Sequence, residues 1–380
     1  MCTKLVYTIS HHDPSPGIGY SELLDKKLFH VLKQYKNAIG NTAKCWDMYK
    51  KQSNLYELVF TTSNELPSLV DLNPHSRSFF KHWEILSDFE SELGFLQGVG
   101  LRCAFLAEGP GGFIEAFVRW RQMKNQYADH LFGATLISND RMVPTWKFEK
   151  EYLDRHNIKL LYGPGGDGSL YNMNNIDSFV DDIGSCSCDY ITSDGGFDFS
   201  GNFNDQELDS LLLIMCEIYT ALRLQTIGGA FLLKLYDVSR VETRALLNIL
   251  YESYASITWI KPHTSRPANS EKYILCRGFE GVGGDVLNTL RRAILKQDYD
   301  ELLNVVEPSG EFIEAIAMYN VVFSIKQIVN INATIALIRE KTTMWHNAKK
   351  QVETALRWCH KYGIPINIDN LHFYQRLRQN

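Results

Sequence analysis

Short apolar runs alternate with amphipathic stretches through the middle of the chain. The runs are typical of buried strands, and the stretches between them repeat apolar residues at the three- and four-residue spacing of a helix. The seven strands that we expect are 101–107, 131–137, 159–162, 189–193, 229–235, 256–260 and 272–277. The helices expected between them are 113–123, 175–183, 206–222 and 241–251. This alternation predicts an α/β fold, with a seven-stranded, mostly parallel sheet and helices on both faces.

Helical patterns without strands flank this central region on both sides. The expected helices before it are 20–38, 44–58 and 78–93, and those after it are 312–341 and 343–362. We therefore predict three parts, which are a helical N-terminal arm over residues 1–70, a central α/β domain over 71–283 and a helical C-terminal appendage over 284–380.

Composition and charge indicate in which compartment of the cell the protein is expected and which molecules it is expected to bind. The 380 residues are 45% hydrophobic and 22% charged, with no uninterrupted run of 18 apolar residues and no secretory signal at the start. We therefore expect a protein of the nucleus or cytoplasm without a membrane span. The formal net charge of −5 does not favour binding of long nucleic acids, although a local groove could hold a short single strand. The eight cysteines form no CxxC pair, which indicates reduced thiols and no metal site.

A glycine-rich turn is the strongest local signal. The stretch FLAEGPGGFIEAF, from Phe105 to Phe117, has the pattern of a strand, a tight turn and a helix. Glycines let the backbone approach a ligand, and the first amides of the helix can bind a carboxylate or phosphate. The stretch matches neither the dinucleotide nor the P-loop fingerprint. It suits S-adenosylmethionine, whose carboxylate would lie near those amides, although the glycines could also serve only to make the turn.

A second glycine cluster, YGPGGDG, runs from Tyr162 to Gly168 after the third expected strand. Its Asp167 could accept a hydrogen bond from an adenine amino group. Glycine and aspartate are also common in turns, so an ordinary loop is the alternative.

Four charged residues lie at strand ends or on a neighbouring helix. Asp194 follows the strand DYITS, Lys234 ends the run GGAFLLK, Glu271 directly precedes the last strand, and Lys81 lies near the start of the helix at 78–93. Singly, the acids could cap helices and Lys81 could be solvated, whereas Lys234 would be costly to bury unpaired. Together they could remove a proton from a ribose hydroxyl. Burial and a second ammonium would lower the pKa of a lysine, and the carboxylates would orient it.

The last expected strand is preceded by an unusually polar segment. In SRPANSEKYILCRGF, from Ser265 to Phe279, several hydrogen-bonding side chains come before an apolar strand. The segment either lines a site or forms an exposed loop before an edge strand.

These motifs together resemble the FtsJ-like ribose 2′-O-methyltransferases. The order GPGGF, FGATL, GGDG, DGGF, GGAFLLKLYD and KPHTSRPANSEKY is most similar to the mRNA cap 2′-O-methyltransferases that make cap 1. The resemblance covers roughly Ser76 to Gly278, and it is weaker for NLYE at Asn54 to Glu57 and for the C-terminal helices. It implies a Rossmann-like class I methyltransferase fold, S-adenosylmethionine as donor, S-adenosylhomocysteine as product and 5′-capped RNA as substrate.

The resemblance also implies roles for individual residues. The implied catalytic residues are Lys81, Asp194, Glu271 and Lys234, the last as proton acceptor. The implied donor-binding residues are Glu108, Gly109, Pro110, Gly111, Gly112, Phe113 and Asp167. The implied RNA-binding residues are Lys50, Asn204, Asp205, Gln206 and Asn269. Glu108 departs from the pattern, because the cap enzymes usually have a small residue there, and an acid could either contact the donor or disfavour its binding.

The expected function is therefore methylation of the ribose 2′-hydroxyl of the first transcribed nucleotide of capped mRNA. The alternatives are the second cap nucleotide, an internal ribose of ribosomal or transfer RNA, a small-molecule methyltransferase and a non-catalytic RNA-binding scaffold. Other capping or transcription proteins are candidate partners.

Overall fold

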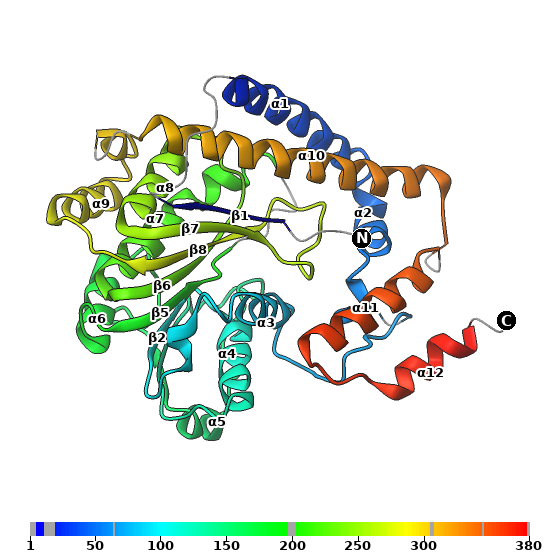
Figure 1. The fold of residues 1–380 in the computed structure, drawn as a ribbon, viewed down its shortest axis with the longest axis horizontal. Coiled ribbons are helices and arrows are strands. Elements are labelled where there is room, and N and C mark those ends of the chain that lie inside the picture. The colour runs from blue at the N-terminus through cyan, green and yellow to red at the C-terminus, as the bar shows by residue number, and fades with distance from the viewer. Residues whose placement is uncertain are drawn as a thin grey trace.

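The computed structural model describes residues 5–10, 20–63, 65–196, 203–304, 308–343 and 346–377. Its centre is an eight-stranded sheet in the order β1-β7-β8-β6-β5-β2-β3-β4 (Figure 1). The strands are β1 Leu5–Ser10, β2 Arg102–Leu106, β3 His130–Ala134, β4 Ile158–Leu161, β5 Cys188–Ser193, β6 Gln225–Leu235, β7 Tyr254–Lys261 and β8 Lys272–Phe279. The seven expected strands are β2 to β8, which confirms the α/β prediction.

The eighth strand, β1, comes from the arm that the sequence pattern predicted to be helical. It pairs antiparallel with β7, from Leu5 opposite Lys261 to Ser10 opposite Ser256. This strand was not predicted from the sequence. The segment is only six residues long, and its pairing partner lies about 250 residues away in the sequence, so no local pattern marks it.

The directions and order of the strands indicate where on the sheet a ligand is expected to bind. Strands β4, β3, β2, β5 and β6 are parallel, while β8 runs antiparallel between β6 and β7. From β2 the chain proceeds outward to β3 and β4, and from β5 it proceeds the other way to β6. In such sheets, ligands bind outside the carboxyl ends of the strands where the order reverses, which here is between β2 and β5.

The described helices surround the sheet. They are α1 Tyr20–Gly40, α2 Ala43–Ser53, α3 Ser78–Asp88, α4 Gly112–Met123, α5 Lys150–Arg155, α6 Met173–Ile183, α7 Gln206–Leu224, α8 Val241–Ser253, α9 Gly284–Lys296, α10 Gly310–Glu340, α11 Ala348–Tyr362 and α12 Ile368–Leu377. Short 3₁₀ turns are η1 Glu57–Val59, η2 Gly94–Gln97 and η3 Asp300–Asn304. The expected helix at 44–58 ends at Ser53, the one at 78–93 ends at Asp88, and the one at 343–362 begins at Ala348, with residues 344 and 345 outside the described part.

Alternate residues of the strands face two separate hydrophobic cores. In β2, Ala104 and Leu106 pack toward α6, α7 and α8, whereas Cys103 and Phe105 pack toward α3, α4 and α11. This alternation follows from the two-residue period of a strand, and it explains why the central strands are apolar throughout.

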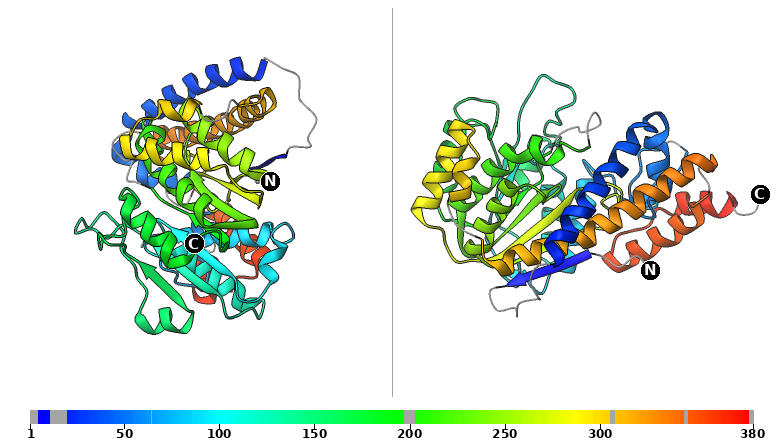
Figure 2. Two further views of the ribbon diagram at one scale, coloured as in Figure 1. Left: turned by 90° about the vertical axis from the view of Figure 1, so that its left-hand side faces the viewer. Right: turned by 90° about the horizontal axis from the view of Figure 1, so that it is seen from above.

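The long helix α10 packs against α1 and α2 beside the β1–β7 edge of the sheet (Figures 1 and 2). By length and composition, α10 is apolar enough to cross a membrane, and it is the one described helix that meets this test. Several of its polar side chains make hydrogen bonds within the fold. Asn320 donates to the Val238 carbonyl at 2.7 Å, and Gln327 donates to the Ala268 carbonyl at 3.2 Å. These contacts support a packing role for α10.

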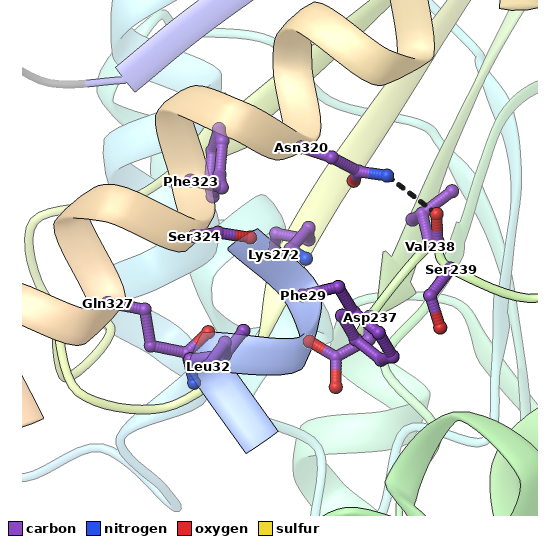
Figure 3. Close-up of a pocket in the computed structure, with 10 residues that line it drawn as sticks. All are labelled: Phe29, Leu32, Asp237, Val238, Ser239, Lys272, Asn320, Phe323, Ser324 and Gln327. Carbon is purple, nitrogen blue, oxygen red and sulfur yellow. Dashed lines mark hydrogen bonds between the residues drawn. The ribbon is translucent and has the colours of Figure 1, made fainter. Parts of the chain in front are cut away.

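A buried polar layer joins α1 and α10 to the end of β6 (Figure 3). Lys36 of α1 pairs with Asp237 at 2.5 Å, and its ammonium also donates to the Phe203 carbonyl at 3.2 Å. Lys272 lies 5.8 Å and 5.5 Å from the ring centroids of Tyr319 and Phe323 on α10. A cavity bordered by Asp237, Lys272 and Phe323 has a volume of about 10 Å³, room for roughly one water molecule. The layer is therefore structural, and through Phe203 it holds the chain just before Asn204.

Candidate active site at the carboxyl ends of the central strands

The four charged residues predicted from strand ends come together as two ion pairs. The Lys81 ammonium lies 2.7 Å from a carboxylate oxygen of Glu271, and the Lys234 ammonium lies 3.2 Å from one of Asp194. All four side chains are only 9% to 12% exposed. Lys81 is therefore not a solvated lysine, and Asp194 and Glu271 form ion pairs with the lysines.

Tyr273 of β8 lies between the two pairs. Its hydroxyl donates to Asp194 at 2.8 Å, and the Lys81 ammonium lies 6.0 Å from the centroid of its ring. Ser265 donates to the second carboxylate oxygen of Glu271 at 2.7 Å. The polar segment before β8 thus lines this site, which excludes the alternative of an exposed loop.

The electrostatics of the pairs differ in one respect from the sequence-based expectation. Burial alone would raise the pKa of Glu271, but Lys81, Lys234 and Lys261 outweigh it, and the pKa is lowered. Burial alone would lower the pKa of Lys234, but Asp194 and the neighbouring Tyr236 and Glu271 outweigh it, and the pKa is raised. The expectation of a lowered lysine pKa was therefore wrong for this structure, because the paired carboxylate stabilises the ammonium more than burial destabilises it.

Lys261, at the end of β7, is a third lysine that the sequence pattern did not single out. Its ammonium donates to the backbone carbonyl and the side-chain oxygen of Asn269 and to the backbone carbonyl of Glu271. Burial lowers the pKa of Lys261 to about 7, with Glu271 opposing and Lys272 assisting the change. The KP dipeptide directly before HTSRPANSE was the available signal. Lys261 fixes the backbone on both sides of Ser270.

The glycine turn joins β2 to α4 and is packed closely on its outer side. A Cβ at Gly109 would lie 2.3 Å from the Pro144 carbonyl oxygen, and one at Gly111 would lie 2.3 Å from the Phe148 ring. Gly111 also has a φ of +112°, which strongly favours glycine. A Cβ at Gly112 would lie 2.3 Å from the side-chain oxygens of Ser76 and Ser78. Close packing therefore accounts for these glycines, whether or not a ligand also binds there.

The other residues of the turn also have partners in neighbouring segments. The Pro110 carbonyl accepts a hydrogen bond from the Lys147 amide at 3.3 Å. Phe113 is fully buried and stacks on His82 with a centroid distance of 4.4 Å, and its carbonyl bonds the His82 ring at 2.9 Å. Because Gly112 and Phe113 open α4, their amides have no acceptor within the helix. The turn therefore presents backbone donors at the β2 end of the crevice.

Glu108 does not project toward solvent. Its side chain is 3% exposed and accepts a hydrogen bond from the Thr192 hydroxyl of β5 at 2.5 Å. Burial raises its pKa well above the usual range, and the nearby Asp194 raises it further. Glu108 therefore lies beneath the turn as a carboxyl that favours the neutral form.

Asp167 lies in the loop after β4. One of its carboxylate oxygens accepts hydrogen bonds from the Ser169 amide at 3.0 Å and from Asn175 at 2.8 Å. A further donor, such as an amino group of a ligand, would bind the other oxygen. The loop role and the ligand-binding role are therefore compatible.

Three of the five residues predicted to touch RNA line one cavity of about 110 Å³. These are Lys50 of α2, Gln206 of α7 and Asn269. Asn204 and Asp205 are not among its lining residues; Asn204 donates to Asn37 of α1 at 2.5 Å, and Asp205 precedes α7. The other lining residues are Lys36, Ile39, Trp46, Phe203, Arg266, Ala268, Ser270 and Gln327. Asn269 also borders a second cavity of about 420 Å³ between residues 53–56, α10 and the segment 261–272.

The motif NLYE anchors the N-terminal arm to this region. Glu57, which is 2% exposed, lies 3.1 Å from Arg77 and 2.9 Å from Arg266, and it accepts a hydrogen bond from Asn54 at 2.8 Å. Burial would raise the pKa of Glu57, but the two arginines outweigh it and the pKa is lowered. The arm therefore positions Arg266 and the rest of the segment before β8.

With this geometry in hand, comparison with known proteins identifies the family. Residues 74–279, more than half of the chain, match the family model described as FtsJ-like methyltransferase. The chain belongs to the FtsJ-like methyltransferase family.

Several relatives of this FtsJ-like chain have closely similar names. It is 35% identical over 236 residues to Cap-specific mRNA (nucleoside-2'-O-)-methyltransferase 1 of Xenopus laevis, covering 59% of this chain and 26% of that protein. It is 33% identical over 244 residues to the 1A protein of Caenorhabditis briggsae, covering 60% and 27%. It is 30% identical over 300 residues to the human protein, covering 74% and 34%. The chain thus spans about a quarter to a third of the length of these relatives.

Two further residues of the candidate site carry no signal in the sequence. Tyr273 lies within β8, a strand that also supplies core residues, so its sequence position does not distinguish it. Glu217 lies inside the apolar helix α7, and its carboxyl lies against Gly195. Residues of this kind are recognised only when the strands and helices are placed side by side.

Proposed function

We propose that this protein transfers the methyl group of S-adenosylmethionine to the ribose 2′-oxygen of the first transcribed nucleotide of capped mRNA. The observation that carries the proposal is the pairing of Lys81 with Glu271 and of Lys234 with Asp194, at the carboxyl ends of β5 and β6 and the amino end of the antiparallel β8. The names of the relatives support the choice of substrate. The family supports a methyltransferase reaction.

The residues of the site fit a sulfonium donor. The amides at the start of α4 suit the donor carboxylate, and Asp167 suits an adenine amino group. When bound, the donor supplies an electrophilic methyl group on a cationic sulfur. The carboxylate of Asp194 suits that positive charge.

The lysines would act on the ribose hydroxyl. Lys234 accepts the hydroxyl proton, which requires its neutral form, and the raised pKa of Lys234 opposes this in the present structure. A positive charge brought close to Lys234 disfavours the ammonium and lowers that pKa. Lys81, fixed by Glu271, donates a hydrogen bond that orients the ribose oxygen. Lys234 thus becomes a base only when a cationic ligand is next to it.

The cavity of about 110 Å³ that Lys50, Gln206 and Asn269 line would receive the capped end of the RNA. A 7-methylguanine base is cationic and stacks on aromatic rings, and Trp46 and Phe203 line this cavity. Lys50 and Arg266 supply positive charge for the phosphates of the cap. A cavity with local positive charge can bind a short capped end even though the formal net charge of the whole chain is −5.

The substrate assignment is tested by transfer of labelled methyl groups to short RNAs that differ only at the 5′ end. One RNA carries a 7-methylguanosine cap, one an unmethylated cap and one a triphosphate. We expect label on the capped RNAs, with the 7-methylguanosine cap preferred. Equal label on all three would contradict the cap assignment in favour of an internal ribose, and no label on any would favour a scaffold.

Asp167→Asn should weaken donor binding about tenfold, because asparagine keeps the acceptor for Ser169 and Asn175 but loses the charged acceptor for the adenine amino group. Isothermal titration calorimetry with S-adenosylmethionine measures the change. Asp182→Asn, which removes a surface carboxylate paired with Lys159, is the matched control. An unchanged Kd for Asp167→Asn would remove Asp167 from the donor site.

A further inference from the structure

Two buried carboxyls beneath the site have no part in the proton transfer described above. Glu217 on α7 is 1% exposed, and Glu108 after β2 is 3% exposed. Each has one buried oxygen without a hydrogen-bond partner among the described residues, namely Oε1 of Glu217 and Oε2 of Glu108. Unpaired buried oxygens are costly and uncommon, so they call for a functional explanation.

Glu217 lies between the ends of the two strands that flank the crevice. Its Oε1 is 2.2 Å from the position that a Cβ on Gly195 would take, and the Cβ of Ala107 is 3.0 Å from the same point. Gly195 follows β5 and Ala107 follows β2. At the next residue, a Cβ on Gly196 would lie 3.0 Å from the Lys234 ammonium. The backbone of Gly195 and Gly196 therefore lies between the Glu217 carboxyl and the ion pair of Lys234 with Asp194.

The protonation state of Glu217 is set by its surroundings. Burial raises the pKa of Glu217 to about 8, Lys234 opposes the rise, Asp194 adds to it, and a hydrogen bond with the Gly195 backbone opposes it. The charged and titratable groups that act on it are Lys234 of β6, Asp194 after β5, Glu108 after β2, Tyr236 after β6, Tyr171 before α6 and the neighbouring Cys216 of α7. The carboxyl of Glu217 therefore favours its neutral form more strongly than an exposed carboxyl does.

We propose that Glu217 recognises the charge of the methyl donor by releasing its proton when a sulfonium cation binds between the ends of β2 and β5. The proposal rests on the proposed function, because it assumes that the donor binds in this crevice. In this step the neutral carboxyl of Glu217 becomes a carboxylate, and its proton leaves to solvent. The neutral thioether product carries no positive charge at sulfur, so it does not induce this ionisation. Glu217 is thus a specificity-determining residue that favours donor over product.

The sign of the pH dependence follows from the direction of the change. A nearby cation favours the carboxylate and lowers the pKa of Glu217 in the complex. Proton release coupled to binding makes the donor bind more tightly as the pH rises toward the pKa of the free protein, by up to about tenfold per pH unit. Above that pKa the carboxyl is already ionised, and the Glu217 contribution to the pH dependence ends.

The test compares the Kd of S-adenosylmethionine between pH 6 and 9 for the wild type and Glu217→Gln. Glutamine has the shape of the neutral carboxyl and cannot ionise. We expect the wild-type Kd to fall with rising pH more steeply than the Kd of the variant. Titration of the donor's own groups is common to both proteins and cancels in the comparison. With S-adenosylhomocysteine, the two proteins should show the same pH dependence.

A second measurement needs no variant. Calorimetric titration of the wild type with the donor near pH 7, in two buffers of different ionisation enthalpy, measures the protons released, and we expect more release with the donor than with the product. Equal release with both ligands, or the same pH slope in Glu217→Gln as in the wild type, would overturn the assignment. Failure of the wild type to bind the donor at all would instead contradict the proposed function.

Discussion

Replacing Lys234 by alanine should reduce methyl transfer by about 10²- to 10⁴-fold, the usual contribution of a positioned general base. The variant removes the group that would accept the ribose proton, while Glu271 and Lys81 remain paired. Donor binding should be kept or strengthened, because Asp194 loses its ammonium partner and can then attract the sulfonium instead. Single-turnover transfer to capped RNA gives the rate, and calorimetry gives the donor Kd.

Lys159→Ala is the control for this experiment, because Lys159 pairs with Asp182 on the surface and should leave transfer unchanged. Near-normal turnover of Lys234→Ala would mean that another group takes the proton. Loss of donor binding together with transfer would show instead that Lys234 supports the pocket. Only a loss of rate with intact donor binding agrees with the proposed base.

Glu57→Ala should lower the free energy of unfolding by about 3–5 kcal/mol, because it leaves Arg77 and Arg266 without their buried counterion. The lowered pKa of Glu57 means that this stabilisation is present above the pKa of the unfolded carboxyl and is lost as the pH falls through the lower folded value. Urea unfolding at neutral and acidic pH measures both effects.

Two further variants serve as comparisons for the stability of Glu57→Ala. Glu57→Gln keeps hydrogen-bond acceptors for the arginines and should be less destabilising than Glu57→Ala. Asp182→Ala breaks an exposed pair and should change stability by less than about 1 kcal/mol. A loss for Glu57→Ala no larger than that of Asp182→Ala would show that the arm is not anchored through Glu57.

Much of the candidate site follows from the sequence because it is built from strand ends. Asp194 follows β5 and Lys234 lies near the end of β6, and the carboxyl ends of these parallel strands meet at one edge of the sheet. Glu271 precedes β8, whose antiparallel direction brings its first residue to the same edge. Lys81 is different, because a lysine near a helix start is usually solvated, and its contact with Glu271 shows that it is buried. No local pattern links these four residues. Their common role was predicted because the order of the motifs resembles that of a known family.

What could not be predicted depends on contacts between distant segments. Strand β1 gains its place by pairing with β7, and Tyr273 gains its role by reaching Asp194 across β6. The pKa of Lys234 has the opposite direction from the one expected, because the sequence does not show how closely Asp194 approaches it. Helix α9 is a different case, since it was not predicted although its buried residues Leu290, Ala293 and Ile294 have helical spacing.

The position of the transferred methyl group tests the central claim most directly. Capped RNA is incubated with the protein and S-adenosylmethionine and then digested to nucleosides and cap dinucleotides for mass spectrometry, with Lys234→Ala as the negative control. The proposed function predicts one methyl group on the ribose 2′-oxygen of the first transcribed nucleotide, absent with the variant. A methyl group on the second nucleotide, on an internal ribose or on a base would contradict it.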